Sequence, residues 1–211
     1  QHFSHRSHEH EPIQALTRLC LHFPEHPDYP KWRYAVALYT DYMKRAYAYT
    51  APYFVAPASI YHEDEAFHDK EYDMGMIQQF IKDEDERREN YRQQVQNGVP
   101  LGKGYFLRKL PVAFAHRGNH ALTLSGGQAA AEFAVLTDDF SLSELAQRQK
   151  EWIVGRNPFA ESVMFGEGYD YCSEYAVLPG EMVGELGVGF ACLDEHDAPF
   201  WPQVNTCVYK E

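Results

Sequence analysis

The sequence lacks the features of a chain that crosses a membrane or binds nucleic acid. Its longest apolar stretch, residues 129–136, is about eight residues long and contains Glu132, whereas a membrane span needs about 20. No block rich in lysine and arginine occurs. The chain has 19 basic residues against 31 acidic ones, a net charge of −12 and a pI near 5.3. Nucleic acid and anionic membrane surfaces are therefore poor partners.

Cysteine is also scarce, and its spacing matches no zinc pattern. The four cysteines are Cys20, Cys172, Cys192 and Cys207. Three lie in the last 40 residues, so they allow either one disulfide bridge or buried free thiols. The chain also contains no phosphate-binding loop, serine nucleophile elbow or dinucleotide-binding fingerprint.

What the chain has is enough apolar sequence for a core and a surplus of tyrosine. Of its 211 residues, 45% are hydrophobic, and 15 are tyrosines. A tyrosine ring packs while its hydroxyl stays solvated, so such rings suit sugar faces as well as cores. We expect a single helical domain over residues 1–211. Because it starts at Gln1 without a leader pattern, we interpret it as an internal piece of a longer protein.

Apolar residues recur at helical spacing along much of the chain. Because Val36, Tyr39 and Met43 repeat at three and four residues, residues 31–48 are predicted to form an amphipathic helix. Further helices are predicted at residues 12–23, 119–136, 141–153 and 180–190. Residues 76–96 are predicted to form a very polar helix, because Glu84 and Arg88 are oppositely charged and four residues apart. Residues 50–72 and 156–179 read as long loops, and residues 102–115 as a strand or an extended connector. The prediction is an all-α fold of antiparallel helical hairpins.

Three local signals refine these boundaries. Ser141 and Glu144 have the spacing of a capping box, and Gly155 is placed to end the helix that follows. The pair Gly126 and Gly127 permits a close approach between two helices despite the low helix propensity of glycine.

The segment EWIVGRNPFAESVMFGEG, residues 151–168, resembles the helix, GxNP turn and GFG-like turn of glycoside hydrolase family 9. RGNHALTLSGGQAAAEFAVLTDD and GEMVGELGVGF are similar to neighbouring segments of that family, so the resemblance covers roughly residues 112–190. It implies an (α/α)6 toroid, of which this chain supplies the C-terminal part. It also implies that the protein is a secreted or periplasmic glycosidase. The aspartate pair of the family has no match here, which leaves open a non-catalytic scaffold.

Glycoside hydrolysis needs a carboxylic acid that protonates the leaving oxygen and a carboxylate that activates water or attacks the sugar. Residues 161–185 concentrate acidic residues among glycines and aromatic rings, which favour raised pKa values. Asp170 and Glu167 are the catalytic candidates from this pattern. The family resemblance adds Glu174, near the position of the family acid. Each has a simpler interpretation as an exposed loop charge.

A second group of candidates lies at the N-terminus. In an extended segment His8 and His10 point to one side and Glu9 to the other, and such groups can hydrogen-bond to sugar hydroxyls. Two histidines and a carboxylate could instead hold a metal ion, or the carboxylates Glu9 and Glu11 could favour the start of a helix.

Five further residues are candidates for substrate binding. Arg117 and Arg156 could each hold a carboxylate through two hydrogen bonds, as an acidic sugar such as a uronic acid would require, or could tie loops to helix ends. His120 follows Arg117 at a predicted helix start. Tyr169 could stack on a sugar ring, and Trp201 could do the same or fill the core.

These observations predict a glycoside hydrolase that acts on a plant or algal polysaccharide, or on an oligosaccharide from it, without an obligatory cofactor. A carbohydrate-binding protein without catalysis is the first alternative. A metalloprotein that uses the N-terminal histidines is the second.

Overall fold

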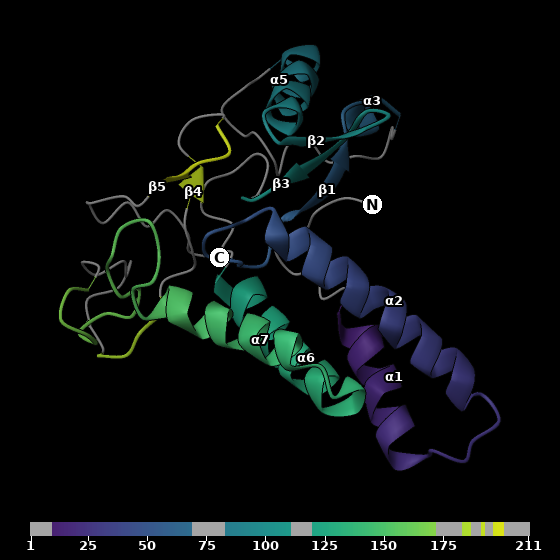
Figure 1. Ribbon diagram of the computed structural model, residues 1–211. Coiled ribbons are helices and arrows are strands. Elements are labelled where there is room, and N and C mark those ends of the chain that lie inside the picture. The colour runs from purple at the N-terminus through teal and green to yellow at the C-terminus, as the bar shows by residue number, and fades with distance from the viewer. Residues whose placement is uncertain are drawn as a thin grey trace.

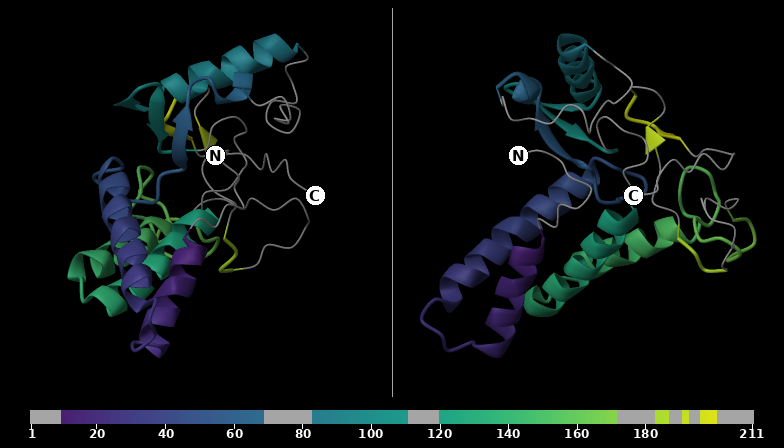
Figure 2. Two further views of the ribbon diagram at one scale, coloured as in Figure 1. Left: turned by 90° about the vertical axis from the view of Figure 1, so that its right-hand side faces the viewer. Right: turned by 180° about the vertical axis from the view of Figure 1, so that it is seen from behind.

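A computed structural model describes residues 10–68, 83–110, 120–171, 183–186, 191–192 and 196–200. The main elements of this part of the chain are two helix pairs and a three-stranded antiparallel sheet, accompanied by two further helices and a two-stranded sheet (Figure 1). In both views of Figure 2 the three-stranded sheet and α5 (Glu84–Gln96) lie at one end of the molecule, and the connection between α1 (Glu11–His22) and α2 (Tyr29–Ala48) lies at the other. The all-α prediction, with hairpins forming part of an (α/α)6 toroid, is therefore wrong: the fold is mixed, although mostly helical.

The first helix pair follows the predicted pattern. Helix α1 (Glu11–His22) has proline in its first turn, and α2 (Tyr29–Ala48) returns antiparallel to it. Val36, Met43 and Ala46 of the predicted stripe are buried. The periodicity thus identified both the helix and the face that it buries.

The second pair consists of α6 (His120–Thr137) and α7 (Phe140–Ile153). Gly127 of α6 faces Gln149 of α7, and a Cβ atom on Gly127 would lie 2.9 Å from the Cβ of Gln149. The predicted close approach is therefore confirmed. Helix α7 begins earlier than its predicted capping box, because Asp139 is the N-cap and accepts a hydrogen bond from the Ser141 amide. Gly155 follows the helix with a φ of +115°, as a helix end predicts.

One strand of the sheet lies in the predicted loop 50–72, and another lies within residues 102–115, for which the predicted strand alternative is confirmed. Strands β1 (Ser59–His62), β2 (Val99–Gly102) and β3 (Tyr105–Arg108) pair antiparallel in the order β1-β3-β2. Helix α3 (Glu65–His68) follows β1, and α5 (Glu84–Gln96) forms the described part of the predicted polar helix 76–96. Tyr61 of β1 meets Tyr91 of α5 edge to face, which joins α5 to the sheet.

The predicted helix over residues 180–190 is wrong where it is described. Residues 183–186 form a turn and an isolated bridge, in which Leu186 pairs with Met164. Strands β4 (Ala191–Cys192) and β5 (Pro199–Phe200) form a two-stranded sheet. Gly184 has a φ of +88°, which a helix cannot accommodate.

Two hydrophobic clusters hold these parts together. The larger lies between the helix pairs and includes Val36, Met43, Phe133 and Leu142. The smaller lies at the C-terminal end of α7 and consists of Leu110, Trp152, Ile153 and Val163, with Tyr53, Val55, Phe159, Met164 and Leu186 packed against them. The smaller cluster is the one on which the candidate site rests.

Candidate functional site

A pocket of about 300 Å³ lies at the C-terminal end of α7, next to the residues that follow β3. We call it the helix-end pocket. This volume is at the lower end of the range for small-molecule sites. Its lining residues come from the segment after α2, the end of β3, α6, α7 and the segment before β5: Thr50, Ala51, Tyr53, Val55, Ala56, Lys109, Leu110, Thr123, Trp152, Pro158, Asp197, Ala198 and Pro199.

Two aromatic rings form part of the pocket wall. The rings of Tyr53 and Trp152 lie 5.3 Å apart between centroids and meet edge to face at 78°. Trp152 is buried, whereas Tyr53 is half-buried. A largely apolar wall with few polar groups is typical of ligand pockets, and aromatic rings supply a flat surface for the apolar face of a ligand.

The segment that carries Asp197 is attached to the end of β3 by a buried ion pair. The Asp197 carboxylate accepts hydrogen bonds from the main-chain amides of Lys109, at 3.0 and 2.9 Å, and Leu110, at 2.9 Å. Its Oδ1 lies 3.6 Å from Nε of Arg108, and that arginine donates a hydrogen bond of 2.6 Å to the carbonyl of Gln94. These contacts fix one wall of the pocket to the sheet and to α5.

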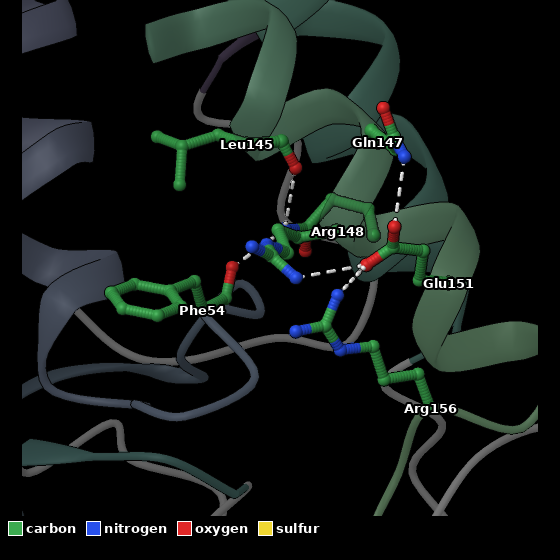
Figure 3. A network of polar contacts seen from close by, with 7 residues as sticks. Phe54, Leu145, Gln147, Arg148, Glu151 and Arg156 are labelled. Atoms are coloured by element: carbon green, nitrogen blue, oxygen red, sulfur yellow. Dashed lines mark hydrogen bonds and ion pairs between the residues drawn. The ribbon is translucent and has the colours of Figure 1, made fainter.

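Gln149 fixes the opposite wall to α7. It is fully buried, and its side-chain oxygen accepts a hydrogen bond of 2.8 Å from the amide of Ala56. Its side-chain amide donates to the carbonyls of Phe54, at 2.7 Å, and Leu145, at 3.0 Å, in the network of Figure 3. The pocket-lining segment 50–56 therefore has a defined position relative to the helix.

The acidic turn, residues 161–171, extends from the same end of α7. The Ser162 amide donates to the carbonyl of Asp170 at 2.9 Å, and the Phe165 amide donates to the carbonyl of Glu185 at 2.9 Å. Gly166 and Gly168, with φ values of +70° and +100°, turn the chain around Glu167. Three of the predicted site residues, Glu167, Tyr169 and Asp170, therefore lie on this turn.

The side chains of these candidates face solvent. Glu167 and Asp170 are exposed, and among the described residues neither forms an ion pair. Tyr169 is 100% exposed, so its ring does not cover the carboxylate beside it. The expected burial beside aromatic rings, which would make one carboxylate an acid, is absent from this described arrangement.

The pocket and the acidic turn nevertheless share one hydrophobic cluster. Tyr53, Leu110 and Trp152 line the pocket, and Val163 and Met164 belong to the acidic turn. All five pack in the smaller cluster. The base of the acidic turn is therefore held against the pocket wall, and the two features form one region.

Arg156 has a structural role. Its guanidinium lies 2.6 Å from the Glu151 carboxylate, which also pairs with Arg148 at 3.1 Å and accepts from Gln147 at 2.8 Å (Figure 3). The neighbouring Asn157 is buried and donates hydrogen bonds to the carbonyls of Trp152 and Glu161, at 2.9 and 2.7 Å. The alternative in which Arg156 ties the loop to the helix end therefore describes it better than a substrate contact does.

Two of the three candidate histidines, His10 and His120, are described, and both are buried at the start of a helix. His10 is 5% exposed and occupies the N-cap of α1, where its carbonyl accepts a hydrogen bond from Gln14. His120 is 1% exposed and begins α6, three residues before the pocket-lining Thr123. The remaining candidates, His8, Glu9, Arg117, Glu174 and Trp201, lie outside the described residues.

Sequence reasoning missed most of the pocket. Trp152 falls within the predicted helix 141–153 but was not a site candidate, and Tyr53, Lys109 and Asp197 were not singled out. No local pattern marks them, because the residues that line the pocket come from positions 50 to 199.

The described residues contain no group of three or more histidine, cysteine, aspartate or glutamate side chains arranged to hold a metal ion. None of the helices in the described ranges has the length and apolar character to cross a membrane. No family model, curated protein or solved structure matches the chain.

Proposed function

We propose that the protein is a glycoside hydrolase that holds a sugar ring in the helix-end pocket. The observation that carries the proposal is the joint position of that pocket and the acidic turn on the smaller hydrophobic cluster. A sugar presents an apolar face of C–H groups and a rim of hydroxyls. Tyr53 and Trp152 suit the first, and the polar groups of the pocket suit the second.

Three polar side chains are available along this wall. Thr50 and Thr123 carry hydroxyls, and Lys109 carries an ammonium group. The Thr50 hydroxyl lies 2.8 Å from the carbonyl of Tyr47 and 2.7 Å from that of Val55, so its position is fixed before any ligand binds. Preorganised groups of this kind orient a ligand at low entropic cost.

The acidic turn supplies the carboxylates for hydrolysis. One carboxylic acid protonates the leaving oxygen while a second carboxylate activates water or attacks the sugar. Glu167 and Asp170 are the described candidates, with Glu174 beyond them. Because both described side chains face solvent, bound substrate must cover one of them before it can act as the general acid.

Binding is tested with a panel of oligosaccharides and isothermal titration calorimetry. Tyr53→Ala removes one ring of the pocket wall, and Tyr34→Ala is the matched control because Tyr34 is 67% exposed on α2. We expect Tyr53→Ala to weaken binding at least about tenfold and Tyr34→Ala to leave it unchanged. Absence of binding to every oligosaccharide, or equal binding by both variants and the parent, would refute the pocket assignment.

Hydrolysis is tested by reducing-end release with Glu167→Gln, Asp170→Asn and Glu174→Gln. Loss of a general acid or base lowers turnover about 10²-fold or more. Glu25→Gln, an exposed change in the connection between α1 and α2, is the control. If all three site variants hydrolyse substrate as fast as the parent, the catalytic assignment is wrong.

Carbohydrate binding without catalysis is the second candidate function. The exposure of Glu167 and Asp170 favours it, because neither carboxylate has the buried surroundings of a general acid. Binding in the calorimeter without release of reducing ends by the parent protein would select this candidate.

A further inference from the structure

Resting on the proposed carbohydrate function, we infer that the helix-end pocket selects a negatively charged sugar, whose anion pairs with the ammonium group of Lys109. The anion is the carboxylate of a uronic acid or a sulfate ester, and both offer lysine the same charge and hydrogen-bond acceptors. From the sequence, such a contact was predicted for Arg117 or Arg156. Arg117 lies outside the described residues, and Arg156 pairs with Glu151, whereas Lys109 is a basic residue that lines the pocket itself.

Of the thirteen described residues that line the pocket, two carry a charge, Lys109 and Asp197. The negative charge of Asp197 is already compensated. Its oxygens accept the main-chain amides of Lys109 and Leu110, and Arg108 lies beside them. The Asp197 side chain is only 8% exposed, so little of it faces a ligand.

Lys109 is in the opposite situation. Within the described part of the chain, no carboxylate lies within ion-pair distance of its ammonium group, although the side chain is half-buried. Its main-chain amide is held by Asp197, so the flexible side chain starts from a fixed point at the pocket wall. A lysine ammonium is a compact charge with three donors, suited to an anion that approaches from several directions.

The selectivity follows from desolvation. A neutral sugar that fills the pocket removes water from the Lys109 ammonium group without replacing it by a counter-charge, which is unfavourable. An anionic sugar replaces the lost water by an opposite charge in surroundings of lower effective dielectric constant, where attraction is stronger.

The net charge of −12 acts against anions over the whole molecule. At physiological ionic strength, charges more than about 8 Å apart are largely screened. The positive charge of Lys109 at the pocket wall therefore outweighs the distant acidic residues, and it determines the preference for an anionic sugar.

The test compares matched sugars in the calorimeter: glucose with glucuronic acid and glucose 6-sulfate, then galactose with galacturonic acid. We expect at least one anionic member of a set to bind about tenfold more tightly than its neutral counterpart. Comparison of the carboxylate with the sulfate identifies which anion the pocket takes. Equal affinity for neutral and anionic members would overturn the inference.

Lys109→Gln keeps the main-chain amide that Asp197 accepts and removes only the charge. We expect it to reduce the preference for the anion to within about twofold while neutral sugars bind as before. The control is Lys103→Gln, which makes the same charge change at an exposed position between β2 and β3. A preference that persists in Lys109→Gln, or that disappears equally in Lys103→Gln, contradicts the role of Lys109.

These results separate the inference from the proposed function. If sugars bind, and Tyr53→Ala weakens binding, but no anion is preferred, the inference fails and the proposed function stands. If no sugar binds the parent protein, the proposed function fails and the inference falls with it.

Discussion

Arg108 and Asp197 form an ion pair that is almost completely removed from solvent, with side chains 0% and 8% exposed. They are separated by most of the C-terminal half of the chain, yet they join the end of β3 to the segment before β5. A charge that loses its partner in such a place remains buried and uncompensated, which is the costly case for ion pairs.

Asp197→Asn is therefore expected to destabilise the protein strongly. It leaves the Arg108 guanidinium without a counter-charge, and we expect the free energy of unfolding to fall by about 3 kcal/mol. Urea denaturation followed by circular dichroism measures the change. Asp41→Asn removes an exposed partner of Arg45 and serves as the control, with an expected change within about 0.5 kcal/mol. Equal losses in the two variants would mean that the buried pair has no special weight.

Gln149→Leu tests the attachment of the segment 50–56. Leucine fills similar space but leaves the amide of Ala56 and the carbonyl of Phe54 without their partner from α7. Each unsatisfied buried group costs about 1–3 kcal/mol, so we expect a loss of at least about 2 kcal/mol in unfolding experiments. Gln147→Leu, on the exposed side of the same helix, is the control, and a loss as large as that of Gln149→Leu in this variant would contradict the argument.

Gly127→Ala tests the close approach of α6 and α7. In a helix interior alanine is favoured over glycine by about 1 kcal/mol. Here the added Cβ would lie 2.9 and 3.1 Å from the Cβ and Cγ of Gln149. The Gln149 side chain cannot easily move away, because its amide group is hydrogen-bonded to Ala56 and Phe54. Overpacking costs about 1–3 kcal/mol, so we expect a net loss of stability. Gln128→Ala, at the exposed neighbouring position, provides the comparison, and a Gly127→Ala variant more stable than the parent would disprove the contact.

Asp139→Ala tests the cap of α7 and its dependence on pH. The hydrogen bonds from Lys44 and then Ser141 hold the pKa of the Asp139 carboxyl below its usual value. A lowered pKa in the folded state means that the ionised group stabilises the fold above its unfolded pKa of about 3.9, and that this contribution is lost as the pH falls through the folded value.

At neutral pH we therefore expect Asp139→Ala to cost about 1 kcal/mol, as the loss of an N-cap does. Below about pH 4 the difference between the variant and the parent should shrink, because the parent carboxylate becomes protonated as well. Thermal unfolding at several pH values measures both. A difference that stays constant from neutral to strongly acidic pH would rule out the ionised cap.

The four helices of the two pairs could be predicted from the sequence because each buries one stripe of residues at helical spacing, as Val36 and Met43 do on α2. Of the sheet, only β3 was anticipated, as one of two alternatives for residues 102–115. The strands of the sheet are four residues each, and they contain Pro100, Gly102 and polar His62, so no clean alternation marks them. They form because β1 pairs with β3, which is distant in the sequence, as Ser59 does with Arg108. This pairing provides hydrogen-bond partners for the main-chain groups of both strands.

The cap of α7 shows how two local signals compete. Ser141 and Glu144 fit a capping box, yet Asp139 lies in an extended conformation that lets its carboxylate accept from the Ser141 amide. A charged acceptor that Lys44 also binds outweighs a serine hydroxyl. Which of two nearby caps is used depends on α2, which local sequence does not reveal.

Only part of the candidate site could be predicted from the sequence. Its acidic turn was recognisable because glycine, tyrosine and carboxylates gather in one stretch, and Glu167 and Asp170 do lie on a turn. The pocket was not recognisable. Lys109 and Asp197 are far apart in the sequence, and the Asp197 carboxylate joins them by accepting hydrogen bonds from the main-chain amides of Lys109 and Leu110.

Because the walls of the helix-end pocket are drawn from residues 50 to 199, the unfolded chain offers no equivalent place for an occupant. Any compound that fits therefore draws the equilibrium toward the folded form and raises the melting temperature in proportion to the logarithm of its concentration once saturation is reached. Differential scanning fluorimetry can rank sugars on this basis, with no need for turnover or a labelled substrate.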